Sequence, residues 1–263
     1  MFYGARRRRF LRRRAWATAS LVCCFCVSCP VYSQTSIVAI KTPTQVVLGA
    51  DSKVKYFTPD GPGPDARECK IVQEGSVFFG VAFVASNTKT GFDAEDIAAR
   101  AIRRARTIEE IVTEFQTMVT GPLRRALKAL PQHYWRDEVK DKAQFQIVFA
   151  AMERGFPVLC GIDIRAAGDS FNLIPQTIGL CRPIERTNGP SGVLSFGLHN
   201  AIDAYLPTHQ GSILRDPAAG VRTLIQLEVD EDKDHVGPPI NILRLNKQGA
   251  KWLNNEENCP KKK

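Results

Sequence analysis

Clusters of metal-binding side chains are lacking from this sequence. Its four histidines, His133, His199, His209 and His235, stand far apart. The four cysteines after residue 34 show none of the short paired spacings of a zinc site. We therefore expect no metal and no cofactor, so any chemistry must come from other side chains.

A basic stripe of the kind that binds nucleic acid is also lacking. The chain is formally +9, with 36 basic and 27 acidic residues, but seven arginines stand at Arg6–Arg9 and Arg12–Arg14. Without these seven, 29 basic residues face 27 acidic ones, and the net charge is +2. Lys261–Lys263 are typical of a solvated tail. The charge pattern predicts no nucleic-acid partner.

The arginines belong to a segment with the layout of an export signal. Residues 1–33 contain no acidic residue, and an apolar run from Ala15 to Val31 follows the arginines. This order predicts an export signal over residues 1–34 and an exported protein, periplasmic or extracellular. Three hydroxyl residues interrupt the apolar run, unlike a permanent membrane span. We expect no membrane contact beyond this signal.

The type of signal stays open. Arg7-Arg8-Arg9-Phe10-Leu11 has the form of a twin-arginine signal, which exports folded proteins. Ser28-Cys29 faintly resembles a lipoprotein box, and an uncleaved signal anchor is a further alternative.

No repeat, linker or low-complexity tract divides residues 35–263, so we expect one large domain there. Strands are predicted where β-branched and aromatic residues cluster. They cover Ile37–Ile40, Val46–Leu48, Lys70–Val72, Val77–Ala85, Phe145–Glu153, Phe156–Ile164, Phe171–Pro183, Leu194–Gly197 and Ile240–Leu245. Thr58–Asp65, rich in glycine and proline, is predicted to be an irregular surface loop.

Helices are predicted over Ala94–Leu130 in two pieces, His199–Tyr205 and Asp216–Val229. Thr107 and Glu110 form a capping box that opens the second piece, and Pro122 is expected to bend or divide it. The helices come in blocks rather than after every strand. The order therefore predicts an α+β fold, a four-layer αββα sandwich of two stacked antiparallel sheets flanked by helices.

Cys69, Cys160, Cys181 and Cys259 remain after the leader. An even number of cysteines in an exported protein allows two disulfides, with three alternative pairings. We hypothesise that Cys160 pairs with Cys181, because they flank a predicted hairpin turn near Gly168-Asp169.

Thr35 stands at the predicted cleavage boundary and opens the first strand. A threonine hydroxyl is a weak nucleophile, and it is activated when the same residue carries a free α-amine that accepts its proton. Such an amine has a pKa of about 7.7 to 8, close to the value a general base needs. A nearby cation and its carboxylate partner complete such a site. The hairpin that begins at Thr35 returns at Asp51, and Lys70 starts the next strand, so these three residues are expected to converge at one sheet edge.

The run from Thr35-Ser36-Ile37-Val38-Ala39 to Ala50-Asp51-Ser52 resembles the opening of proteasome β subunits. These begin with a nucleophilic Thr and reach Ala-Asp-Ser at the same spacing. Lys70-Ile71-Val72 is similar to the Lys-Ile/Val pair that enters the family's next strand, after a slightly longer loop. The resemblance implies an N-terminal-nucleophile (Ntn) hydrolase fold. It implies Thr35 as nucleophile, Lys70 as the cation that tunes its amine, and Asp51 as the partner of Lys70. A peptide or other amide substrate, an acyl-enzyme and a homo-oligomer are implied as well.

Three positions depart from the family pattern. Phe196 stands where the family has the middle Ser of Gly-Ser-Gly, which helps to polarise the amine. Val236 replaces the Ser near the fourth helix, where Asp232 or Asp234 would supply the family's Asp. The oxyanion-hole glycine falls near Phe83, whose backbone N–H can still donate.

The sequence therefore supports two functions. The first is a proteasome-like threonine peptidase or amidohydrolase. The second is a catalytically inactive Ntn-fold binding or assembly subunit. In that case Asp51 only caps the hairpin, and Lys70 only prevents a strand edge from pairing with another chain. The small-residue rule places signal cleavage after Ser33, which leaves Gln34 first, whereas the peptidase requires Thr35 first.

Overall fold

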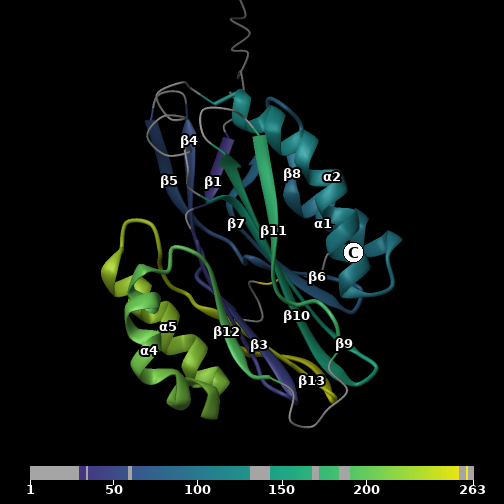
Figure 1. The fold of residues 1–263 in the computed structure, drawn as a ribbon. Coiled ribbons are helices and arrows are strands. Elements are labelled where there is room, and N and C mark those ends of the chain that lie inside the picture. Colours follow the sequence, from purple (N-terminus) through teal and green to yellow (C-terminus); the bar gives the residue numbers. More distant parts are fainter. Residues whose placement is uncertain are drawn as a thin grey trace, which may run out of the picture.

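The computed structural model describes residues 30–33, 35–58, 61–130, 143–167, 172–183, 190–254 and 259. The arginine-rich and apolar parts of the predicted signal, Gln34, the turn at Gly168-Asp169 and the lysine tail lie outside the described residues. In the described part the protein is an α+β protein with two main antiparallel sheets and four helices packing on them (Figure 1).

The larger sheet has its strands in the order β11-β10-β9-β7-β1-β4-β5, and β6 and β8 also pair with β7. Their bounds are β1 Pro30–Ser33, β4 Lys53–Thr58, β5 Gly61–Arg67, β6 Ile71–Glu74, β7 Val77–Asn87, β8 Phe92–Asp93, β9 Ala143–Glu153, β10 Phe156–Ala167 and β11 Asn172–Leu180. The long hairpin of β9 and β10 and its partner β11 form one side of this sheet.

The smaller sheet has the order β12-β2-β3-β13-β14. Its strands are β2 Ser36–Lys41, β3 Gln45–Ala50, β12 Gly192–Gly197, β13 Asn241–Asn246 and β14 Gly249–Asn254. The predicted hairpin from Thr35 to Asp51 is confirmed as β2 and β3, with Ile37 opposite Ala50.

The helices are α1 Ala94–Arg104, α2 Ile108–Lys128, α4 Asn200–Arg215 and α5 Pro217–Glu231. Thr107 is confirmed as the N-cap of α2, because its hydroxyl accepts from the Glu110 N–H at 3.3 Å. The Glu110 carboxylate accepts from the Arg106 N–H at 2.8 Å, one residue before the N–H that a capping box uses. At α5, the Asp216 side chain accepts from the Ala219 N–H at 3.1 Å, with Pro217 in the first turn.

Buried apolar side chains form three clusters, one between each pair of neighbouring layers. One cluster joins α1 and α2 to the outer face of the larger sheet, around Phe115, Phe145 and Phe149. A second joins the facing sides of the two sheets, including Ile37 and Phe78. The third joins α4 and α5 to the smaller sheet. The helix pairs therefore lie on opposite outer faces of the two sheets, as Figure 1 shows.

The structure differs from the predicted elements in three places. Thr58–Asp65 is not a loop throughout, because β5 begins at Gly61. Proline is tolerated there because β5 is the edge strand of its sheet. Pro122 does not divide α2, which runs unbroken to Lys128. The helix expected to end at Tyr205 continues as α4 to Arg215.

Two disulfides join Cys160 to Cys181 and Cys69 to Cys259. The first confirms the hypothesised pair, since Cys160 lies on β10 and Cys181 directly follows its neighbour β11. Disulfides persist in oxidising compartments. The pair is therefore consistent with a protein that works outside the cytoplasm.

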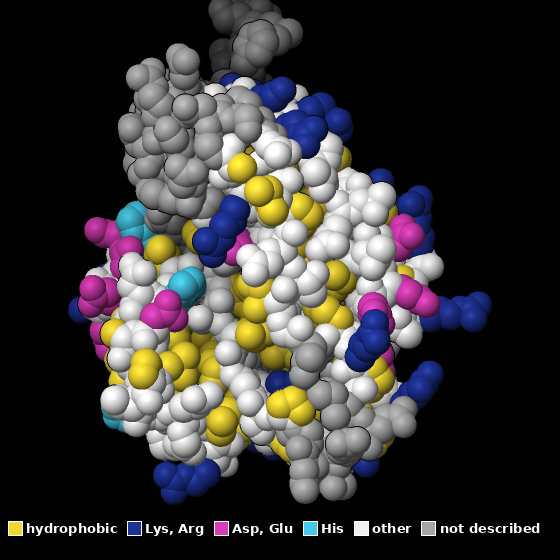
Figure 2. All heavy atoms as spheres, viewed as in Figure 1, with side chains coloured by type: hydrophobic (Ala, Val, Ile, Leu, Met, Phe, Trp, Pro, Cys, Tyr) yellow, Lys and Arg dark blue, Asp and Glu magenta, His cyan; other side chains and the backbone are white. Residues whose placement is uncertain are grey.

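None of the helices in the described ranges has the length and apolar character that a membrane crossing requires. On the face drawn in Figure 2, basic side chains are scattered among acidic ones.

Alkylation tests the disulfides. In the exported protein we expect iodoacetamide to label none of the four cysteines of residues 35–263 before reduction, and all four after reduction under denaturing conditions. Mass spectrometry of the peptides reports each site. Labelling of Cys69 or Cys160 without reductant would contradict the pairing.

Candidate active site

The three predicted site residues lie at strand ends that the fold brings together. Thr35 directly precedes β2, Asp51 directly follows β3 and Lys70 directly precedes β6. All three are buried: Thr35 and Asp51 are 0% exposed and Lys70 is 6% exposed. The hairpin returns Asp51 to the level of Ser36, and the Asp51 N–H donates to the Ser36 carbonyl at 3.2 Å.

The carboxylate of Asp51 is the centre of this arrangement. Its Oδ1 accepts from the Lys70 Nζ at 2.8 Å and from the Ser36 N–H at 3.0 Å. Its Oδ2 accepts from the Lys53 N–H at 3.0 Å and the Gly237 N–H at 3.2 Å. One carboxylate oxygen therefore links the Lys70 ammonium to the backbone of the residue that follows Thr35.

Burial lowers the pKa of Lys70 from its ordinary value, and the charge and hydrogen bond of Asp51 oppose this shift. A lowered pKa means that the Lys70 ammonium gives up its proton at a lower pH than a solvated lysine does. Lysines of this kind are found at functional sites more often than on ordinary surfaces.

Close packing on β12 fixes the backbone of Thr35. The Thr35 carbonyl accepts from the Leu198 N–H at 2.8 Å. Gly197 lies against that carbonyl so closely that a Cβ on it would fall 1.7 Å from the Thr35 oxygen. Gly197 also has a φ of +77°, which favours glycine. Only glycine fits this position.

Gln146 is a site residue that the sequence reasoning missed. It lies on β9, in the other sheet, and its side-chain Oε1 accepts from the Gly197 N–H at 2.6 Å. Gln146 is 4% exposed, so this bond crosses between the sheets at a buried position beside Thr35. The sequence contains one signal: Gln144 and Gln146 stand on either side of Phe145 in an otherwise apolar run.

Phe196 is buried between the sheets and cannot replace the family's hydroxyl. A Cβ on Gly161 would fall 2.5 Å from the Phe196 ring, so the ring is packed directly on β10. Phe83, by contrast, has a φ of +69°, a conformation that is rare for residues other than glycine. This is the position where the resemblance expects an oxyanion-hole glycine, and strained backbone of this kind is concentrated at functional sites.

The segment after α5 contributes backbone and not the expected side chains. Asp232 accepts from His235 at 2.8 Å and is occupied there. Val236 is fully buried among the residues that pack α5 on its sheet. Gly237 instead donates to Asp51 and accepts from the Ser52 N–H at 3.1 Å.

Strand β1, which falls inside the predicted signal segment, lies next to the site. It pairs antiparallel with β4 along one edge and with β7 along the other, and Ser33 lies opposite Phe83. The backbone that leads to Thr35 is therefore an extended segment held on both sides.

In the described part of the chain, no group of three or more His, Cys, Asp and Glu side chains is arranged to hold a metal ion. Comparison with models of known protein families and with curated proteins finds no match.

Removing Lys70 tests the buried pair. Lys70→Met leaves the Asp51 charge buried and unpaired, so the free energy of unfolding should fall by about 3 to 5 kcal/mol. The double variant Asp51→Asn/Lys70→Met should lose less, because it buries no charge. Urea unfolding measures both. Arg103→Met is the matched control: its pair with Glu74 is exposed and should cost about 1 kcal/mol or less.

Replacing Gln146 tests the bond between the sheets. Gln146→Leu leaves the buried Gly197 N–H without an acceptor, so we expect a loss of about 1 to 3 kcal/mol in urea unfolding. Gln226→Leu removes an exposed amide that bonds Asp230 and should change stability by about 0.5 kcal/mol or less. Equal effects of the two variants would show that Gln146 contributes nothing beyond a surface hydrogen bond.

Proposed function

We propose that residues 35–263 are an Ntn hydrolase related to proteasome β subunits, which acts after export as a threonine peptidase or amidohydrolase. One observation carries the proposal: the buried Asp51 carboxylate bonds both Lys70 and the N–H next to Thr35. A buried ion pair is weak evidence for stability alone. This ion pair lies beside Thr35, where the charge of Lys70 can lower the pKa of a free α-amine.

The fold supports the same proposal. Two sheets with apolar facing sides, and a helix pair on each outer face, form the layers expected of an Ntn hydrolase. The hairpin that opens the smaller sheet supplies both Thr35 and Asp51.

The proposed reaction begins once the chain starts at Thr35. The Thr35 Oγ attacks the carbonyl carbon of an amide, and the free α-amine of the same residue takes the hydroxyl proton. Lys70 favours the neutral form of that amine by its charge. The backbone N–H at Phe83 stabilises the oxyanion of the tetrahedral intermediate. The C–N bond then breaks, and the amine leaving group departs with the proton.

Hydrolysis completes the cycle. The first step leaves an ester between Thr35 and the acyl part of the substrate. A water molecule attacks this ester while the α-amine accepts its proton, and the released Thr35 Oγ regains a proton. The free acid leaves, and the residues return to their starting states.

Strand β1 supports a peptide as the substrate. Residues 30–33 are an extended peptide that pairs on both sides and leads to Thr35. After cleavage ahead of Thr35 and departure of this strand, β4 and β7 would offer the same backbone groups to another extended peptide. Before that cleavage the nitrogen of Thr35 is an amide and cannot accept the hydroxyl proton, so removal of the leader needs another base or another peptidase.

Phe196 favours the second candidate, an inactive binding or assembly subunit of the same fold. It fills the place of a hydroxyl that the resemblance expects, and it is tightly packed there. In that case β1 stays in the sheet and Thr35 never gains a free amine.

The N-terminus of the exported protein separates the two candidates. We expect mass spectrometry to find Thr35 as the first residue, and a β-lactone or epoxyketone probe to label it. Thr35→Ala should abolish labelling, and Ser36→Ala should keep it. Labelling should rise with pH as the amine loses its proton, and it should level off below about 8, because Lys70 lowers the pKa of the amine from its ordinary value. A chain that starts at Gln34 and resists the probe would refute the peptidase.

A further inference from the structure

A hollow of about 560 Å³ opens between the two sheets at the end away from Thr35. At the Thr35 end, Ala50 of β3 pairs with Asn241, the first residue of β13. Asn246, which lines the hollow, pairs with Gln45 at the other end of β3. Asn246 stands five positions after Asn241, about 17 Å further along the strand. The hollow therefore takes no part in the proposed reaction.

The floor of this hollow is apolar and belongs to the core between the sheets. Phe78 of β7 and Leu245 of β13 line the hollow, and both are members of the buried cluster that joins the facing sides of the sheets. Met152 of β9 packs against the same cluster. Two small residues, Gly155 and Ala250, complete this part of the lining. A hollow of this size with largely apolar walls is in the range of small-molecule sites.

One cation stands at the rim of the hollow. Lys247 belongs to the turn between β13 and β14, and its ammonium lies 5.5 Å from the centre of the Phe156 ring on β10. A Cβ on Gly155 would fall 3.7 Å from the Lys247 Cε. The lysine side chain therefore reaches from the smaller sheet to the larger one at the rim.

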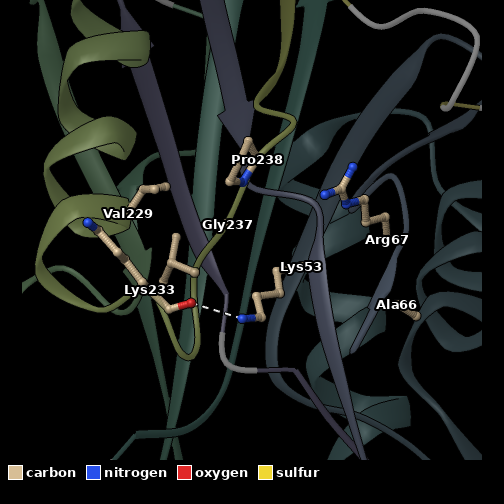
Figure 3. A pocket seen from close by; sticks show the side chains of 8 residues that line it. Lys53, Ala66, Arg67, Val229, Lys233, Gly237 and Pro238 are labelled. Atoms are coloured by element: carbon tan, nitrogen blue, oxygen red, sulfur yellow. Dashed lines mark hydrogen bonds between the residues drawn. The ribbon is translucent and has the colours of Figure 1, made fainter. Parts of the chain in front are cut away.

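This lysine is available to a ligand, unlike the lysine of another hollow. In the hollow that Figure 3 shows, Lys53 already donates to the Lys233 carbonyl at 2.8 Å. Lys247 has no hydrogen bond or ion pair with a described residue. Its neighbour Asn246 accepts from the Gln248 N–H at 2.9 Å through Oδ1, which leaves the NH₂ of Asn246 as a donor. A cation and an adjacent NH₂ can bind the two oxygens of one carboxylate.

The acidic side chains on the neighbouring strands point away from the hollow. Glu74 of β6 pairs with Arg103 on α1, and Glu153 of β9 accepts from the Ile108 N–H at the start of α2. Both contacts lie on the outer face of the larger sheet, which the helices cover. The residues that line the hollow are all described, and none of them is acidic. Lys247 is therefore the charge that a ligand meets there.

We propose that this hollow binds a small amphipathic carboxylate, such as a medium-chain fatty acid. Its apolar chain would lie on Phe78 and Leu245 and gain free energy by leaving water. Its carboxylate would meet Lys247, whose charge favours a negative head group over a neutral or positive one. A single cation suits a single negative charge. The site is independent of the chemistry at Thr35.

Calorimetric titration of the exported protein tests the site with three probes that share one chain length: sodium octanoate, 1-octanol and octylammonium chloride, all below the concentration at which they form micelles. We expect saturable binding of octanoate, weaker binding of octanol and none of octylammonium. Lys247→Met should weaken octanoate binding about fivefold, the size expected of an exposed charge pair, and leave octanol binding unchanged. Ala250→Phe, a substitution at an exposed position of the rim, should weaken both by filling the hollow.

Lys251→Met is the matched control, because Lys251 is an exposed lysine on β14 outside the lining. It should bind octanoate as the unaltered chain does. Thr35→Ala should also bind it normally, so the result is separate from the fate of the peptidase proposal. The site would be overturned by a lack of saturable octanoate binding, by equal binding of octanoate and octylammonium, or by equal effects of Lys247→Met and Lys251→Met.

Discussion

One carboxylate joins separate segments of this protein. Asp51 takes two donors on each oxygen, and these come from the start of β2, the start of β4, the residue before β6 and the segment after α5. A buried carboxylate loses several kcal/mol of hydration, and only a full set of donors offsets that loss. The four segments therefore depend on one another, and Thr35 is attached directly to one of them.

This arrangement places few demands on the side chains around Asp51. The donors to Asp51 are one lysine and three backbone N–H groups, so the neighbouring side chains are free to vary. Val236 and Phe196, at positions where the resemblance expects serines, are apolar and pack into the core. Gly237 contributes to Asp51 through its backbone N–H alone.

The parts of the site that the sequence could predict are those joined by short connections. A hairpin places Asp51 level with Ser36 by strand geometry alone, and Lys70 enters the strand that follows. Gln146 could not be found this way, because it reaches Gly197 from the other sheet. Strand β1 was missed because its residues have the composition of a signal segment. Strand β5 was missed because its prolines are compatible only with a sheet edge, and edges cannot be recognised before the strand order is known.

The disulfide between Cys69 and Cys259 has a consequence for the order of events in folding. Cys69 is the residue before Lys70, and its partner lies 190 positions later. The disulfide beside Lys70 can form only after Cys259, close to the end of the chain, has been synthesised and the two thiols have been oxidised. In a reducing cytoplasm this disulfide does not persist, so the segment before Lys70 is covalently joined to Cys259 only in an oxidising compartment.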